Sequence, residues 1–213
     1  MRLFLASARY QDGQLRVVSS LPDGNQGVAA AQTVFADVIV QAQLSMSEGA
    51  DDDLYGLFVR SPSSDLYYTF ATSPSGYAFI SMFEGEYVPL VSGPLDPDLH
   101  FAYGLGQPNM FSVVAVGRRP TTSIGKLCAC RLPRANLSQK FGRLRLVPKS
   151  GLSAELLGPS LTFILNGRLV SSEIVDDRYF DGFLGFYVHH GRRSALAELT
   201  ADWIQVRGVF PPS

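Results

Sequence analysis

The stretch from residue 161 to residue 188, LTFILNGRLVSSEIVDDRYFDGFLGFYV, constrains the fold more than any other part of the chain. It contains three apolar runs, which are separated by Asn166-Gly167 and by Asp181-Gly182. Asn-Gly and Asp-Gly between apolar runs are strong hairpin signals, because these residues tolerate the positive φ that tight turns require. The stretch therefore predicts antiparallel strands joined by narrow turns.

The remainder of the chain repeats this pattern, with a turn signal about every ten residues, which is the spacing typical of a sandwich or barrel. Strands are expected at residues 33–44, 54–60, 66–72, 77–83, 87–91, 109–117, 161–165, 168–174, 183–189 and 196–206. A hairpin is expected at residues 8–19, and loops are expected at 21–27, 45–53 and 93–108. The frequent prolines and the absence of a helical stripe favour an all-β fold of one domain, residues 1–213.

Charge is distributed unevenly along the chain. The formal net charge is −1, yet residues 118–160 contain nine basic residues and one acid, so the other residues sum to about −9. The segment predicts either a basic arm for an acidic partner or an insert without a role. Phe141 is its only aromatic residue, so a stacking platform for nucleic acid is not expected. Cys128 and Cys130 also fall here, and no His lies near them to complete a metal site.

The order of several short motifs resembles a known family. These motifs are Asp37-Val38, Tyr55-Gly56-Leu57 with Arg60, Tyr67-Tyr68 before Gly76-Tyr77, Asn109 before 113–117, Asn166-Gly167, and Asp177 with Phe180-Asp181-Gly182 and Gly185. Their order resembles concanavalin A-like (laminin G-like) jelly rolls of bacterial proteins, including domains similar to family-16 glycoside hydrolases or 3-keto-disaccharide hydrolases. The resemblance covers roughly residues 30–117 and 161–207. It implies an antiparallel two-sheet jelly-roll sandwich with one concave sheet.

The resemblance is interrupted at residues 118–160. In the family, the strand that ends at Gly117 would turn almost directly into residues 161–165. A structureless connection of this length is unusual in a compact domain, whereas a hairpin tip tolerates extra residues at little cost. The segment is therefore interpreted as an insertion into a hairpin.

Family-16 chemistry is not expected. Retaining glycosidases of this fold carry a Glu-x-Asp-x-x-Glu run, whose period of two places carboxylates on one face of one strand. The sequence contains no such run, and Glu84-Gly85-Glu86 lies in an expected turn between strands. The chain is therefore expected to be non-catalytic.

The concave sheet is the expected binding face. Alternation along residues 54–60 places Tyr55, Leu57 and Val59 inward, with Gly56 leaving room on the other face. The candidate ligand-binding residues on that face are Phe58, Arg60, Tyr67, Tyr77 and Phe79. Aromatic rings stack on sugar faces, and an arginine donates hydrogen bonds to hydroxyls or carboxylates. The plainer interpretation is that a loop or the insertion covers these aromatic residues.

No cofactor is expected apart from a structural calcium ion, which the resemblance implies at the rim of the sandwich. Its candidate ligands are Asp51, Asp53, Asp177 and Asp181, although their spacing matches no calcium-loop motif. His189 and His190 are adjacent on an expected strand, so they would point to opposite faces and could not share one metal.

The sequence thus favours a non-catalytic module that binds a glycan or another extended ligand. A structural or protein-interaction domain of a larger protein, and a glycoside hydrolase acting on a modified disaccharide, remain as alternatives. No run of 18 apolar residues predicts a membrane span. The apolar run after Met1-Arg2 is too short for a signal peptide. The compartment is therefore extracytoplasmic if a native N-terminus was trimmed, and cytoplasmic otherwise.

Overall fold

The structure is a computed structural model that describes residues 7–20, 24–29, 33–117, 160–171, 174–175, 178–179, 181–191 and 193–208. Side chains are described throughout these ranges except in 24–29 and at residue 175. Within these ranges, no helix is long and apolar enough to cross a membrane.

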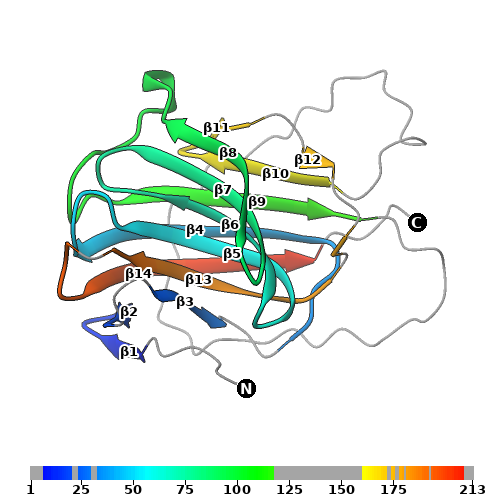
Figure 1. The fold of residues 1–213 in the computed structure, drawn as a ribbon, viewed down its shortest axis with the longest axis horizontal. Coiled ribbons are helices and arrows are strands. Elements are labelled where there is room, and N and C mark those ends of the chain that lie inside the picture. Colours follow the sequence, from blue (N-terminus) through cyan, green and yellow to red (C-terminus); the bar gives the residue numbers. More distant parts are fainter. Residues whose placement is uncertain are drawn as a thin grey trace.

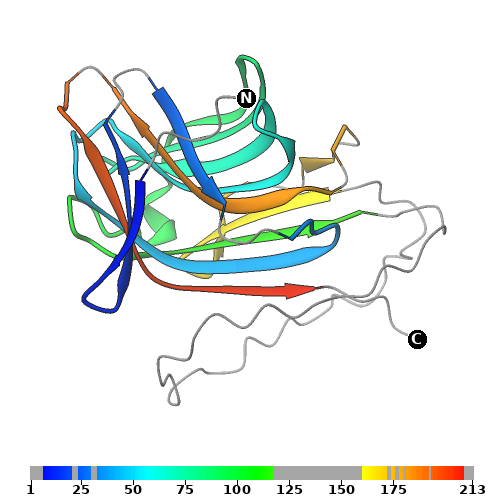
Figure 2. The ribbon, with the colours of Figure 1, turned by 90° about the horizontal axis from the view of Figure 1, so that it is seen from below.

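Two antiparallel sheets pack face to face, as Figure 2 shows from below, so the prediction of an all-β sandwich of the jelly-roll kind is confirmed. The first sheet has the order β1 (Ser7–Gln11), β2 (Gln14–Ser19), β14 (Ala197–Gly208), β4 (Val38–Glu48), β9 (Asn109–Val116), β10 (Ser160–Leu165), β11 (Arg168–Leu169), and β12 (Ile174–Val175) pairs with β10. The second sheet has the order β3 (Gly24–Ala29), β13 (Phe183–His190), β5 (Leu54–Ser63), β6 (Leu66–Thr72), β7 (Tyr77–Glu84), β8 (Tyr87–Pro94) (Figure 1). A short 3₁₀ helix, η1 (Pro97–Leu99), lies in the connection from β8 to β9.

The pairing of β9 with β10 is the feature on which the insertion hypothesis depends. The two strands are antiparallel neighbours in which Val116 pairs with Ser160 and Phe111 with Leu165. They therefore form the hairpin that the sequence predicts once the basic segment is set aside. The segment itself, with Cys128 and Cys130, lies outside the described residues up to residue 159, and its role as an insertion stays a prediction.

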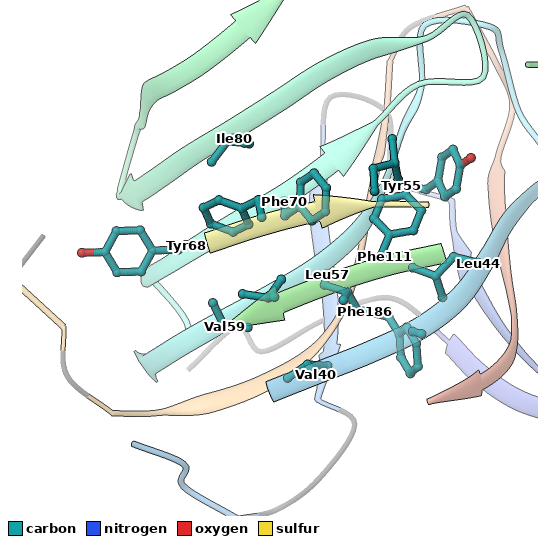
Figure 3. Packing of buried hydrophobic residues seen from close by; sticks show 14 of the residues in the cluster. Val40, Leu44, Tyr55, Leu57, Val59, Tyr68, Phe70, Ile80, Phe111 and Phe186 are labelled. Atoms are coloured by element: carbon teal, nitrogen blue, oxygen red, sulfur yellow. The ribbon is translucent and has the colours of Figure 1, made fainter. Parts of the chain in front are cut away.

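The core between the sheets follows the alternation of the strands. Val38, Val40, Ala42 and Leu44 of β4 are buried, while Gln41 and Gln43 are partly exposed. From the facing sheet, Tyr55, Leu57 and Val59 point into the same core, as predicted. The rings of Phe70 and Phe111 pack against each other in this core, with their centres 5.3 Å apart. Both side chains are labelled in Figure 3.

The tight turns also confirm the sequence signals. Asp12-Gly13 and Asn166-Gly167 have positive φ values, between 50° and 80°, and connect β1 to β2 and β10 to β11. A positive φ at both central residues matches the right-handed twist of the flanking strands. Asn166 adds a further constraint, because its side-chain oxygen accepts a hydrogen bond from the amide of Met110 at 2.8 Å.

Several boundaries differ from the expected ones; the strand expected at 33–44, for example, begins only at Val38, and the strand expected at 54–60 continues to Ser63. Residues 24–27 are expected in a loop, but they form the start of β3. Antiparallel pairing with β13 holds them in an extended conformation. Residues 45–48 were also assigned to a loop but extend β4, because β14 pairs with it as far as Glu48. The expected strand at 168–174 is instead the two short strands β11 and β12.

Candidate functional site

The outer face of the six-stranded sheet is the face on which the sequence placed a ligand. The registers align Tyr187, Gly56, Ala71, Phe79 and Ser92 in one row across five strands. A second row contains Tyr67, Phe83 and Tyr87. Because side chains in one cross-strand row share a face, aromatic residues from β6, β7, β8 and β13 gather here.

Aromatic side chains fill the middle of this face. Phe58, Tyr67, Ala71 and Tyr187 form a buried cluster, and Phe83 and Tyr87 pack against it. The rings of Tyr67 and Phe83 are stacked with centres 4.9 Å apart. This cluster, which we call the outer aromatic cluster, excludes water from the centre of the face.

Three tyrosine hydroxyls tie the cluster together. The Tyr87 hydroxyl lies 2.8 Å from that of Tyr187 and 3.4 Å from that of Tyr67. Burial raises the pKa of Tyr67 to about 12. Burial likewise raises the pKa of Tyr87 and of Tyr187 above the ordinary tyrosine value. The three phenols are therefore neutral hydrogen-bonding groups at any physiological pH.

The structure divides the five candidate ligand-binding residues into groups. Phe58 and Tyr67 lie together inside the outer aromatic cluster, 2% and 7% exposed. Arg60 is equally buried and lies where the register of β5 shifts, with a φ of 51°. The regular alternation that placed Arg60 beside Phe58 therefore ends at Val59.

Tyr77 and Phe79 instead line a pocket of about 500 Å³ at one end of the face. Tyr77 is 43% exposed, whereas the Phe79 ring is partly buried. The rings of Phe79 and Tyr87 meet edge to face, with their centres 5.5 Å apart. The other lining residues are Asp52, Leu54, Ser73, Ser75, Pro89, Ser92 and His189. The pocket is thus lined by two aromatic rings together with polar groups, namely serine hydroxyls, one carboxylate and one imidazole.

Gly56 lies in the same row as Phe79 but is not among the residues that line this pocket. A Cβ atom at Gly56 would lie 2.0 Å from the carbonyl oxygen of Phe70 and 2.8 Å from the Cα of Ala71. The missing side chain therefore accommodates the backbone of β6, not a ligand.

A second cavity of about 550 Å³ adjoins this pocket. Gly49, Ala50, Asp51, Asp52, Ser75 and Arg193 line it. The guanidinium of Arg193 lies 3.3 Å from a carboxylate oxygen of Asp52, and both side chains are largely exposed. The loops before β5, after β6 and after β13 therefore form a continuous polar border at this end of the sandwich.

Asp53 holds this border in place. Its carboxylate accepts hydrogen bonds from the Ala50 amide at 2.7 Å, the Gly191 amide at 2.8 Å and the Ser194 hydroxyl at 2.7 Å. The residue is fully buried, and a buried carboxylate requires such donors. Asp53 thus fixes the loop that presents Asp52 to the loop that presents Arg193.

These hydrogen bonds bear on the expected calcium ion. One oxygen of Asp53 already accepts two of them and the other accepts one, which leaves little capacity for a cation. Asp51 is exposed in the same loop as Asp53, Asp181 lies beside the Phe35–Gly182 bridge, and Asp177 lies outside the described residues. Among the described residues, no three His, Cys, Asp or Glu side chains are grouped as a metal site. These observations do not test the expected calcium ion, whose presence stays a prediction.

Sequence reasoning did not assign Asp52, Ser92 or His189 to a binding pocket. His189 was considered only as a metal ligand, and the structure places it on the pocket face while His190 is fully buried on the other. Period-two alternation across neighbouring strands could have found His189 and Ser92, because both share the outer face with Phe79. Asp52 belongs to a loop, whose direction alternation does not determine.

A further exposed aromatic residue borders this end of the sandwich. The Tyr103 ring rests over Gly76, where a Cβ atom would meet it at 2.3 Å. Gly76 itself has a φ of 82°, and its amide donates a hydrogen bond to the carbonyl oxygen of Ser73 at 2.9 Å. Glycine is therefore required here both by the turn and by the ring.

Comparison with known proteins supports the fold. No protein-family model and no curated protein sequence matches this chain. Among solved structures, the carbohydrate-binding module CBM66 from Bacillus subtilis is 11% identical, with a TM-score of 0.60 over 95% of this chain and 92% of that one. A xylan β-1,4-xylosidase from Bacillus halodurans is 12% identical, with a TM-score of 0.52 over 92% of this chain. A GH43 protein from Bacillus licheniformis is 12% identical, with a TM-score of 0.54 over 93% of this chain.

The chain spans about a third of the length of the latter two proteins, 33% and 34%. Identities this low establish a shared architecture and leave ligand and activity to the chain's own residues. The architecture that this chain shares with these proteins is the antiparallel β-sandwich, consistent with a concanavalin A-like fold.

Proposed function

We propose that this chain is a non-catalytic glycan-binding module of the laminin G-like type. The observation that carries the proposal is the pocket in which the Tyr77 and Phe79 rings meet the polar side chains of Asp52, Ser92 and His189. Sugars present an apolar face and a ring of hydroxyls, so a site that binds them combines aromatic surface with hydrogen-bonding groups.

The pocket has the size and accessibility that such a ligand requires. Its volume of about 500 Å³ lies within the range typical of small-molecule sites. The exposed Tyr77 ring can lie against a sugar without any movement of the sheet. The outer aromatic cluster supports Phe79 from behind through Tyr87, which holds the ring in position before a ligand arrives. The structural likeness to a carbohydrate-binding module agrees with this proposal at the level of the fold.

Affinity electrophoresis and calorimetry with soluble polysaccharides test the proposal. We expect retardation by a neutral polysaccharide such as xylan or a β-glucan, and a loss of about tenfold or more in affinity for Tyr77→Ala, because ring stacking is removed. Tyr10→Ala is the matched control, since Tyr10 is an exposed tyrosine on β1 of the other sheet. Absence of binding to every glycan tested, or equal loss in both variants, contradicts the proposal.

The same experiment separates the alternatives. A purely structural or protein-interaction domain would show no glycan binding. A hydrolase would release products from a modified disaccharide, and its turnover would be lost in Asp52→Asn, which replaces the carboxylate in the pocket. We expect no turnover of the disaccharide by the wild type or by Asp52→Asn. An acidic partner for the basic segment stays a separate prediction.

A further inference from the structure

We infer that the ligand is a neutral oligosaccharide of at least two units that occupies both cavities at the loop end of the sandwich. This inference rests on the proposed function, and it adds the length and charge of the ligand. The first cavity is the pocket that Tyr77 and Phe79 line, and we call it the aromatic cavity. The second, lined by Ala50, Asp51 and Arg193, is called the polar cavity.

The two cavities share a wall. Asp52 and Ser75 line both of them, so a ligand that contacts these residues in the aromatic cavity is adjacent to the polar cavity. Backbone hydrogen bonds fix this wall, because the Ser75 amide donates to the carbonyl oxygen of Asp51 at 3.1 Å. The Ser75 hydroxyl also lies 2.8 Å from that of Ser73, another residue of the aromatic cavity. The border between the cavities is therefore preorganised.

The polar cavity provides hydrogen-bonding groups in place of rings. Arg193 and Asp52 form an ion pair at 3.3 Å, with side chains 80% and 55% exposed. An ion pair this exposed contributes little to stability, so its groups can exchange solvent for sugar hydroxyls at small cost. A guanidinium next to a carboxylate offers donors and acceptors together, which matches the paired hydroxyls of a sugar.

The charge of this end favours a neutral ligand over an acidic one. Among the described residues, the polar cavity is lined by two carboxylates, those of Asp51 and Asp52, and by one guanidinium, that of Arg193. Like charges repel, so these two carboxylates oppose the approach of an anionic ligand. An oligosaccharide of uronic acids would therefore bind more weakly than a neutral one of equal length.

Calorimetry with xylo- and cello-oligosaccharides of one to six units tests the inference. We expect affinity to increase with length until both cavities are filled and then to level off. Arg193→Ala should lower the affinity for the longer oligosaccharides about three- to tenfold and leave the monosaccharide unchanged, because Arg193 lines only the polar cavity. Tyr77→Ala should weaken binding at every length. Arg207→Ala, an exposed arginine on β14, is the matched control.

The outcomes distinguish this inference from the proposed function. If no oligosaccharide or polysaccharide binds, the proposed function fails and the inference fails with it. If glycans bind with loss in Tyr77→Ala, but affinity is independent of length and Arg193→Ala equals the wild type, only the two-cavity inference is wrong. If oligogalacturonate of equal length binds as well as the neutral series in low salt, the assignment of a neutral ligand is wrong.

Discussion

The hydroxyl oxygens of Tyr87 and Tyr187 lie 2.8 Å apart, although three strands separate β8 from β13 in the sheet. In a flat sheet, strands in these positions would be roughly 19 Å apart, at about 4.8 Å per neighbouring strand. Direct contact between the two phenols therefore requires a strongly curved sheet and side chains that reach toward each other across it. The pair joins the two sides of the concave face, and the pocket that Tyr77 and Phe79 line lies at the loop end of that face.

Removing the Tyr87 hydroxyl should destabilise the protein. Tyr87→Phe leaves the buried hydroxyl of Tyr187 without its phenol partner, which costs about 1–3 kcal/mol of unfolding free energy. Urea unfolding measures this, and Tyr10→Phe on the exposed face of β1 should change the free energy by less than about 0.5 kcal/mol. Equal midpoints for the two variants would show that the hydroxyl contact contributes nothing.

Alkaline pH should unfold the protein through the same cluster. The pKa of Tyr67 is raised to about 12, whereas an unfolded tyrosine titrates near pH 10. A raised pKa means that the folded state holds the proton more tightly. Its contribution is therefore complete below about pH 10 and is lost as the pH rises toward about 12.

Absorbance of tyrosinate during a pH titration measures this effect. We expect the tyrosines of the outer aromatic cluster to ionise only together with unfolding, as circular dichroism reports it. Ionisation of all nine tyrosines near pH 10 in a protein that remains folded would contradict the buried cluster.

Gly56→Ala should prevent correct pairing of β5 with β6. The added Cβ would lie 2.0 Å from the Phe70 carbonyl oxygen, and the obstacle is backbone, which cannot rotate away. We expect loss of soluble folded protein or a destabilisation of more than about 3 kcal/mol. Gly191→Ala is the control, because its nearest neighbour would be the Asp53 carboxylate at 3.6 Å, an ordinary contact. Similar melting temperatures for both variants would show that this close approach is absent.

Much of the architecture could be predicted from local sequence signals. Alternation along β5 correctly placed Tyr55, Leu57 and Val59 in the core, and Asn166-Gly167 correctly marked a tight turn. These signals act over two to ten residues, where pattern and backbone geometry coincide. Residues 24–27 have no such pattern and still form a strand, because backbone pairing with β13 stabilises an extended conformation that their local propensity does not favour.

The candidate site was less predictable for a physical reason. The sequence indicates which side chains share a face but not how far the sheet curves, so the contact between Tyr87 and Tyr187 could not be foreseen. The bulge at Arg60 likewise depends on the shift in pairing between Val59 and Ser63. Curvature and bulges decide that Phe58 and Tyr67 are buried together while Tyr77 and Phe79 line a pocket.

The carboxylate of Asp53 should be essential for the stability of the fold, and this stability should not depend on added metal. Asp53→Asn replaces one acceptor oxygen with a donor in a site that already contains three donors, which costs about 2–4 kcal/mol. The exposed Asp52→Asn is the control and should change the unfolding free energy little. A chelator should leave the melting temperature of the wild type unchanged. If the chelator clearly lowers the melting temperature and added calcium restores it, the protein binds a calcium ion. That result would contradict the expectation that the hydrogen bonds of Asp53 disfavour a metal ion.

The most direct measurement is an amide chemical-shift titration of the protein with xylotetraose and cellotetraose. The account predicts that the largest changes fall on Tyr77, Phe79, Ser92 and His189, with smaller changes at Ala50 and Arg193. Amides of Phe58 and Tyr67 should move least among the aromatic residues of this face, because their rings are buried. Shifts centred on Phe58 and Tyr67, on the opposite sheet, or on no residue at all would contradict a glycan site at the loop end.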